Sequence, residues 1–254
     1  MICIVCIVIS VVLGLTLIWG TQDNPAFSQG ERMHTLPLQF RERHLFLELD
    51  GDLWLLDTGA PASFGTPRGL TLAGEPFNFG ANYLGLTAET LAQFVGMPCV
   101  GLLGADVLGR FDHLFDIAGG SLTVSTDELP HNGQTVRLDM FMGIPIVTAR
   151  ISGRDYRMFF DTGAQISYFQ DDSLAAYPPA GRVTDFYPGF GQFQADTYHV
   201  PAALGGVGFT LRCGALPRLL ATALMQMNTE GIVGNAILRD RKVGYFPRRR
   251  LMAL

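Results

Sequence analysis

The chain contains the segment LWLLDTGA at residues 53–60 and a second version of it, MFFDTGA, at residues 158–164. Each places Asp-Thr-Gly-Ala directly after an apolar run, and the two aspartates, Asp57 and Asp161, are 104 residues apart. Average residue usage would place any one such tetrapeptide in roughly one chain of this length in a few hundred. Two copies in the same local context therefore indicate an internal repeat.

A second pair of matching segments follows the first pair. GLLGADVL spans residues 101–108 and GIVGNAIL spans residues 231–238, so both read Gly, two apolar residues, Gly, and Leu four positions later. Upstream of each aspartate, a two-residue turn, Asp50-Gly51 or Ser152-Gly153, predicts a hairpin of two strands. A repeat this long indicates two related lobes, because the repeats of solenoids span about 20 to 50 residues.

These motifs resemble those of the aspartic proteases of the pepsin and retroviral-protease superfamily, over about residues 40–246. The resemblance implies an all-β fold of two pseudo-twofold-related lobes, in which an apolar-Asp-Thr-Gly loop and a later apolar-apolar-Gly strand interlock. It also implies two catalytic carboxylates, two hydroxyls that brace the loops, and four glycines that let the loops turn or pack closely. These positions are Asp57 and Asp161, Thr58 and Thr162, and Gly59, Gly163, Gly104 and Gly234.

The lobes and their few helices can be placed along the chain. We expect a first lobe at residues 36–130 and a second lobe at residues 131–254, joined by a linker near Leu129–Thr135. Short strands between Gly, Pro, Asn and Asp turns are predicted throughout. Two helices are expected, over Thr87–Val95 and over Pro217–Met227.

The paired carboxylates have a direct chemical use. Two carboxyl groups within hydrogen-bond reach cannot both ionise cheaply, so they share one proton and titrate as a coupled pair, and aspartic protease dyads are the standard example of this effect. One group can then take a proton from a water molecule while the other polarises the scissile carbonyl, so hydrolysis needs neither a metal nor a covalent intermediate. We expect equivalent surroundings for Asp57 and Asp161 and do not assign acid and base between them.

The residue after each Asp-Thr-Gly is alanine, Ala60 or Ala164, as in retroviral-type enzymes, whereas pepsin-like enzymes usually carry Ser or Thr there. A hydroxyl at this position would stabilise the ionised carboxylates. Alanine therefore predicts a pair that is easier to protonate, and an activity profile that reaches from mildly acidic to near-neutral pH.

The predicted function is peptide-bond hydrolysis by an aspartic endopeptidase, acting on an extended polypeptide with apolar side chains in a cleft between the lobes. The alternative is a non-catalytic peptide-binding or sensor module that keeps the fold, because folds outlive their functions. Two Asp-Thr-Gly loops favour the enzyme, since a binding module has no need of two mutually repelling carboxylates. The short first unit, with 40 residues between Ala60 and Gly101 against 66 between Ala164 and Gly231, favours the module.

A hairpin that covers the cleft is expected in the second lobe, over Asp185–Phe193. Its arms are aromatic and its tip is rich in glycine, and the residues assigned to it are Tyr187, Gly189, Phe190 and Gly191. Pepsin-like enzymes carry the functional flap in the first lobe, so an ordinary surface hairpin is the alternative interpretation.

Composition fits a β-rich globular enzyme of 254 residues, with 48% hydrophobic residues and 30 glycines. A net charge of −5 and only 16% charged residues give no basis for nucleic-acid binding. The one dense basic cluster, Arg248-Arg249-Arg250, is predicted to be a solvated tail. No histidine stands in a spaced metal motif, so neither a metal nor a cofactor is expected. A monomer is expected because both catalytic aspartates lie in one chain.

The N-terminus carries an uncharged run of 18 apolar or small residues, 2–19, which is about the minimum length for crossing a bilayer. We expect residues 1–20 to form a transmembrane helix that anchors the chain, with a cleaved signal peptide as the alternative. Residues 21–35 are expected to be a tether, and the catalytic unit is expected on the export side, in the periplasm or outside the cell. Two further cysteines, Cys99 and Cys213, occupy non-equivalent places in the two units and need not pair.

Overall fold

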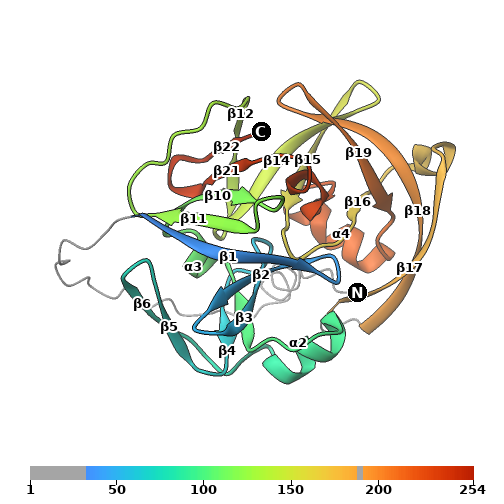
Figure 1. The fold of residues 1–254 in the computed structure, drawn as a ribbon. Coiled ribbons are helices and arrows are strands. Elements are labelled where there is room, and N and C mark those ends of the chain that lie inside the picture. Colours follow the sequence, from blue (N-terminus) through green and yellow to red (C-terminus); the bar gives the residue numbers. More distant parts are fainter. Residues whose placement is uncertain (1–32, 188–190) are drawn as a thin grey trace.

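The computed structural model describes residues 33–187 and 191–254, which form two large β-sheets and a few short helices (Figure 1). The predicted all-β class is therefore confirmed. Two small ribbons lie beside the large sheets within the described part of the chain. They pair β5 (Gly69–Leu72) with β6 (Glu75–Asn78) and β7 (Asn82–Tyr83) with β8 (Leu86–Thr87).

One sheet has ten strands in the order β12-β22-β21-β10-β11-β1-β2-β3-β9-β4. Its neighbours pair antiparallel, except β3 and β9, which pair in parallel. Residues 33–35, at the end of the segment expected to be a tether, are the first residues of β1. The bounds are β1 (Met33–Arg41), β2 (His44–Leu49), β3 (Asp52–Leu56), β4 (Phe64–Gly65), β9 (Gly101–Leu103), β10 (Asp112–Asp116), β11 (Ser121–Ser125), β12 (Thr135–Arg137), β21 (Val243–Phe246) and β22 (Leu251–Ala253).

The other sheet has eight strands in the order β13-β14-β15-β20-β16-β19-β18-β17. Here the parallel pairs are β15 with β20 and β16 with β19. The bounds are β13 (Asp139–Phe141), β14 (Ile144–Ile151), β15 (Arg154–Phe160), β16 (Ser167–Phe169), β17 (Pro179–Tyr187), β18 (Gly191–Leu204), β19 (Val207–Gly214) and β20 (Gly231–Val233).

Both predicted hairpins are present, as β2–β3 and β14–β15. Asp50 and Gly51 have φ of 52° and 86°, and Ser152 and Gly153 have φ of 47° and 82°. Two successive residues with positive φ form the two-residue turn whose twist matches that of a hairpin. In each hairpin, the second strand then pairs in parallel with the strand of the later glycine motif, so the sequence repeat is also a structural repeat.

The two predicted helices are confirmed as α2 (Ala88–Val95) and α4 (Arg218–Gln226). The Thr87 side chain accepts a hydrogen bond from the Thr90 N–H, and Gly96 ends α2 in the left-handed region. The remaining helical segments in the described residues are short. They are α3 (Ala105–Leu108), η1 (Asp172–Ala176), η2 (Asn235–Leu238) and η3 (Pro247–Arg249).

The end of the chain returns to the sheet of the first half. Strand β21 pairs with β10, and β22 pairs with β12, so the last strands lie beside strands from the first half and the centre of the sequence (Figure 1). A core cluster accordingly contains side chains from both sheets, among them Phe115, Phe160 and Tyr245. This packing fixes the two aspartate-bearing hairpins relative to one another.

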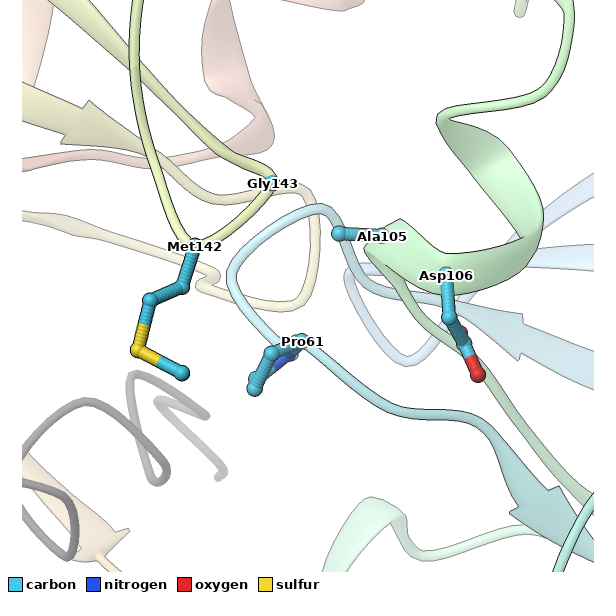
Figure 2. Close-up of a pocket in the computed structure, with 5 residues that line it drawn as sticks. All are labelled: Pro61, Ala105, Asp106, Met142 and Gly143. Atoms are coloured by element: carbon cyan, nitrogen blue, oxygen red, sulfur yellow. The ribbon is translucent and has the colours of Figure 1, made fainter. Parts of the chain in front are cut away.

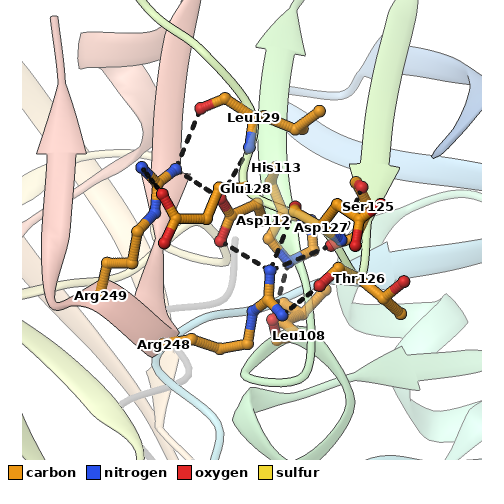
Figure 3. A network of polar contacts seen from close by, with 10 residues as sticks. All are labelled: Leu108, Asp112, His113, Ser125, Thr126, Asp127, Glu128, Leu129, Arg248 and Arg249. Carbon is orange, nitrogen blue, oxygen red and sulfur yellow. Dashed lines mark hydrogen bonds and ion pairs between the residues drawn. The ribbon is translucent and has the colours of Figure 1, made fainter. Parts of the chain in front are cut away.

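The prediction that Arg248 and Arg249 belong to a solvated tail is wrong. Both guanidinium groups pair with the carboxylate of Asp112, which is fully buried and also accepts a hydrogen bond from the Leu129 N–H at 3.0 Å (Figure 3). A buried carboxylate is tolerated only with partners of this kind. The contacts of Asp112 with Arg248, Arg249 and Leu129 therefore hold the C-terminal strands and the segment after β11 together.

The predicted anchor, residues 1–20, lies outside the described residues. Within residues 33–187 and 191–254, no helix is long and apolar enough to cross a membrane. Cys99 and Cys213 are unpaired thiols, and burial raises the pKa of Cys99 to about 11 and that of Cys213 to about 12. Neither thiol is therefore ionised at neutral pH.

Candidate active site

The two Asp-Thr-Gly loops begin where parallel strand pairs end. Asp57 follows β3, and its N–H donates to the Leu103 carbonyl of β9 at 3.0 Å. Asp161 follows β15, and its N–H donates to the Val233 carbonyl of β20 at 2.9 Å. The same backbone contact thus places both aspartates in the same way within their halves of the molecule.

The threonines of the loops bind each other across the molecule. The Thr58 N–H donates to Thr162 Oγ1 at 3.0 Å, and the Thr162 N–H donates to Thr58 Oγ1 at 3.1 Å. Each hydroxyl donates in turn to the strand before the opposite aspartate, Thr58 to the Phe160 carbonyl (2.7 Å) and Thr162 to the Leu56 carbonyl (2.8 Å). These four reciprocal bonds are fully buried and hold the two loops in register.

This contact brings the two carboxyl groups together. A Cβ added to Gly59 would lie 2.5 Å from Asp161 Cγ, and a Cβ added to Gly163 would lie 2.6 Å from Asp57 Oδ2. Each carboxyl therefore packs on the glycine of the opposite loop, which no other residue could replace. The Oδ1 atoms accept hydrogen bonds from their own loops: Asp57 from the Gly59 N–H (2.9 Å), and Asp161 from the N–H groups of Gly163 (2.8 Å) and Ala164 (3.1 Å).

The Oδ2 atoms differ from the Oδ1 atoms. Both are buried, and among the residues that the structure describes neither has a hydrogen-bond partner other than the opposite carboxyl. Burial raises the pKa of Asp57 well above its ordinary value, and the charge of Asp161 raises it further. Burial also raises the pKa of Asp161, to about 6, although hydrogen bonds from Asp57, Gly163 and Ala164 oppose the rise. Both shifts therefore favour a pair that keeps a proton to higher pH than two separate carboxyls would.

The two later glycines support the loops from behind. A Cβ on Gly104 would lie 2.6 Å from the Ala60 carbonyl, and a Cβ on Gly234 would lie 2.6 Å from the Ala164 carbonyl. These carbonyls accept hydrogen bonds from the residues after the glycines, at 2.7 Å and 2.9 Å. Both contacts need a glycine because the chains approach too closely for a side chain.

Sequence reasoning missed two serines that complete this support. Ser63 Oγ accepts from the Gly104 N–H at 2.9 Å, and Ser167 Oγ accepts from the Gly234 N–H at 3.1 Å. Ser63 also donates to Asp106 Oδ1 at 2.6 Å. The signal for them was present, since each serine stands six residues after its aspartate.

A polar contact joins the Asp161 loop to the first half of the chain. The turn between β1 and β2, Glu42–Arg43, supplies the two backbone carbonyls that accept the hydrogen bonds of this contact. Gln165 Nε2 donates to the Glu42 carbonyl and Asn235 Nδ2 donates to the Arg43 carbonyl, each at 2.9 Å. Gln165 Nε2 also lies 2.6 Å from Nε2 of the buried His44. We call these three side chains, His44, Gln165 and Asn235, the polar latch.

The Asp57 loop has a different neighbour at the equivalent place. The matching turn of the second repeat, Met142–Gly143, lies against Pro61 and Ala105 and leaves a pocket of about 330 Å³, also lined by Asp106. Met142 and Pro61 face the same space (Figure 2). Pro61 and Ala105 stand where the second repeat has Gln165 and Asn235, so the two sides of the site are chemically unequal.

The expected covering hairpin is β17–β18. Tyr187 ends β17 and is buried, Gly191 begins β18, and the tip residues Gly189 and Phe190 lie outside the described residues. Phe186 of this hairpin stacks on Phe94 of α2, with ring centroids 3.8 Å apart and planes inclined by 23°. The hairpin thus contacts a helix that belongs to the first half of the chain.

The described residues contain no group of three or more His, Cys, Asp or Glu side chains arranged to hold a metal ion. Known proteins give little further guidance. No family model matches the chain, and no curated protein matches it. Among solved structures, the chain is similar to the solution structure of the simian foamy virus (mac) protease, with 22% identity, coverage of 28% of this chain and 78% of that chain, and a TM-score of 0.24. A likeness this limited carries no argument, and the functional conclusion rests on the geometry of the two loops.

Proposed function

We propose that this protein is an aspartic endopeptidase with a retroviral-type active site built from one chain. The observation that supports it most strongly is the pair of buried carboxyls, Asp57 and Asp161, each lying on the glycine of the opposite loop. Burying carboxyl oxygens with so few partners destabilises a fold, and among the described residues the two Oδ2 atoms have none except the opposite carboxyl. Groups kept in such a state at the junction of two lobes fit a chemical role better than a structural one.

In the proposed reaction, a water molecule binds between the Oδ2 atoms of Asp57 and Asp161. The ionised carboxylate takes a proton from this water as the water oxygen bonds to the scissile carbonyl carbon, and the protonated carboxyl gives its proton to the carbonyl oxygen, which forms a tetrahedral gem-diol. The carboxyl that received the proton of the water then gives it to the leaving nitrogen as the C–N bond breaks. The other carboxylate takes a proton from a hydroxyl of the intermediate, which leaves a carboxylic acid product and restores the singly protonated pair. Because the Oδ1 atoms are held by backbone N–H groups, the Oδ2 atoms remain available to the water.

The proposed substrate is an extended polypeptide with apolar side chains. The hairpin β17–β18 reaches from the second half of the chain to α2 in the first half through the Phe186–Phe94 stack. We propose that this hairpin, with Tyr187 and Gly191 near its tip, covers the cleft and pins the substrate backbone. A strand-like substrate suits such a cover because its backbone groups can pair with the hairpin edge.

We further propose that the enzyme acts as a monomer, tethered to a membrane by residues 2–19 with its catalytic unit on the export side. The apolar, uncharged character of that segment supports the tether. One chain supplies both aspartates and both bracing threonines, so a second copy is not needed to complete the site.

The test is incubation of the detergent-purified full chain with a mixed peptide library between about pH 4 and pH 8, with products read by mass spectrometry. Cleavage that is blocked by a statine-type transition-state analogue is expected. The variants Asp57→Asn and Asp161→Asn are the controls and should yield no products. Peptide binding without cleavage by the unaltered chain would instead support the non-catalytic module.

A further inference from the structure

An asparagine side chain connects the Asp161 loop to the first half of the chain. Asn235 is buried, and its amide nitrogen donates to two backbone carbonyls, that of Arg43 at 2.9 Å and that of Thr162 at 3.1 Å. Carbonyl oxygens only accept hydrogen bonds, so these two contacts determine which end of the amide is the nitrogen. Asn235 thus joins the turn between β1 and β2 to the loop that carries Asp161.

The Thr162 carbonyl belongs to the same peptide unit as the Gly163 N–H. That N–H donates to Asp161 Oδ1 at 2.8 Å. A peptide unit is planar and rigid, so a hydrogen bond that holds its carbonyl also fixes the direction of its N–H. Three hydrogen bonds and one peptide unit therefore connect the Arg43 carbonyl, through Asn235, to the carboxyl of Asp161.

The Asp57 loop has the same backbone contact without this side chain. The counterpart of Asn235 is Ala105. The Ala105 N–H donates to the Ala60 carbonyl at 2.7 Å, as the Asn235 N–H donates to the Ala164 carbonyl at 2.9 Å. A methyl group cannot donate a hydrogen bond, so the backbone contact forms without a side-chain amide. The amide of Asn235 calls for another explanation.

The two carboxyls differ in the donors that they receive. Asp161 Oδ1 accepts from two N–H groups, those of Gly163 at 2.8 Å and Ala164 at 3.1 Å. Within the described part of the chain, Asp57 Oδ1 accepts at such geometry from one, that of Gly59 at 2.9 Å. Burial raises the pKa of both carboxyls, and the hydrogen bond between them raises the pKa of Asp57 further while it lowers that of Asp161. Both differences favour an ionised Asp161 beside a protonated Asp57.

We propose that Asn235 is a positioning residue that holds the Thr162–Gly163 peptide and thereby makes Asp161 the general base of the pair. The inference rests on the proposed function and deepens it, because it assigns base and acid to two residues that the sequence leaves equivalent. Asn235 acts through the peptide and does not touch the reacting atoms.

The ionisable groups around Asp161 stay the same when Asn235 is replaced. Besides burial, a hydrogen bond from Asp57 of the opposite loop and the charge of Asp185 of β17 act on the pKa of Asp161. Burial lowers the pKa of His44, in the polar latch, to about 4, so its ring is neutral near neutral pH. A neutral replacement of Asn235 therefore changes the hydrogen bonds around Asp161 without changing a charge.

The test compares Asn235→Leu with Thr229→Val in the full chain. Leucine has nearly the shape of asparagine but cannot donate. Thr229 is a matched control because it is equally buried and its hydroxyl donates to a backbone carbonyl, that of Leu224, at 2.9 Å. We expect Asn235→Leu to lower kcat about ten- to a hundredfold, as small misplacements of reacting groups do. KM should stay within about twofold because peptide binding is untouched. Thr229→Val should lower only the stability.

A second readout needs no turnover. The carboxyl carbon of Asp161, labelled with ¹³C and assigned by the loss of its signal in Asp161→Asn, is titrated by NMR in each variant. Releasing the Thr162–Gly163 peptide weakens a hydrogen bond to the ionised carboxylate. The midpoint should therefore rise by about half a pH unit or more in Asn235→Leu and stay in place in Thr229→Val.

The reverse change gives the Asp57 loop the donor that it lacks. The pocket of about 330 Å³ beside Ala105 has room for a larger side chain. Because the backbone contacts of the two positions match, the amide in Ala105→Asn should reach the Thr58 carbonyl as Asn235 reaches that of Thr162. The titration midpoint of Asp57, labelled in the same way, should then fall.

The outcomes separate the two proposals. If the unaltered chain cleaves no peptide, the proposed function fails, while the titrations still test the positioning role. An unmoved Asp161 midpoint in Asn235→Leu, or an equal shift in Thr229→Val, overturns the positioning role and leaves the proposed function standing. A moved midpoint with wild-type kcat overturns the assignment of the base. Should Asn235→Leu fail to fold, Ala105→Asn decides, and an unmoved Asp57 midpoint overturns the role.

Discussion

Replacing Asp161 by asparagine is expected to stabilise the fold near neutral pH while abolishing hydrolysis. Burial raises the pKa of Asp161 from its ordinary 3.8 to about 6, and each pKa unit corresponds to about 1.4 kcal/mol. The pKa of Asp161 is higher in the folded than in the unfolded protein. The stability that this carboxyl contributes is therefore fully present below its pKa in the unfolded chain, and it is lost as the pH rises through its pKa in the folded protein. Ionising Asp161 in the folded protein therefore costs about 3 kcal/mol.

Asparagine avoids this cost without breaking the local bonds. Its Oδ1 can accept from the Gly163 and Ala164 N–H groups as Asp161 does, and its amide nitrogen can donate to the Asp57 carboxyl in place of the hydrogen bond that the two carboxyls share. We expect the free energy of unfolding to rise by about 3 kcal/mol at about pH 8, and the difference to vanish below about pH 4. Urea unfolding, followed by the fluorescence of the buried Trp54, measures both values.

The control is Asp116→Asn, which should change stability in the opposite direction. Hydrogen bonds from Lys242 and the Gly119 N–H lower the pKa of Asp116, so its contribution is present above the unfolded pKa and is lost as the pH falls. This variant should be less stable than the unaltered chain near neutral pH. The reasoning is refuted if Asp161→Asn gains nothing at about pH 8, or gains equally at both ends of the range.

Three further predictions concern the loops and the N-terminus. Thr58→Val and Thr162→Val each remove one hydroxyl of the reciprocal threonine contact and leave a buried N–H of the opposite loop unpaired. Each variant should therefore lower the free energy of unfolding, measured by urea titration, by about 2–4 kcal/mol. Unequal losses would contradict the symmetry of the contact between the two loops. The double variant Ala60→Ser, Ala164→Ser adds hydroxyl donors to the ionised carboxylates, and both limbs of the pH–rate profile should shift toward acid. Limbs that do not move would count against a role for these alanines in setting the pH profile. Deletion of residues 1–20 should move the chain from the membrane pellet to the soluble fraction, and a full-length chain that alkaline extraction already releases would exclude the tether.

The parts of the fold that local chemistry requires could be predicted from the sequence. Asp50-Gly51 and Ser152-Gly153 are residues that tolerate positive φ, and the structure uses both turns. Thr87 and Gly96 bound α2 because their capping roles depend on the helix ends alone. The repeated tetrapeptide indicated that Asp57 and Asp161 meet, and the structure brings them together.

The parts that depend on distant partners could not be predicted. In the sequence Arg248 and Arg249 resemble a solvated tail, because their partner, the buried Asp112, is distant in the chain and only the fold brings it beside them. The latch joins residues more than a hundred positions apart, and nothing near His44 in the sequence marks its contact with Gln165. The repeat gave no sign that the two sides of the active site differ, because the motifs match while the residues that pack behind them do not.

The measurement that tests the central claim most directly is the turnover of one cleaved peptide by four forms of the full chain: unaltered, Asp57→Asn, Asp161→Asn, and the double variant. Two carboxyls that share one proton work as a unit, so losing both should cost no more than losing either. We predict the same residual rate for all three variants, at least about a thousandfold below that of the unaltered chain. Wild-type turnover by either single variant, or a double variant whose loss is the product of the two single losses, would contradict the shared carboxyl pair.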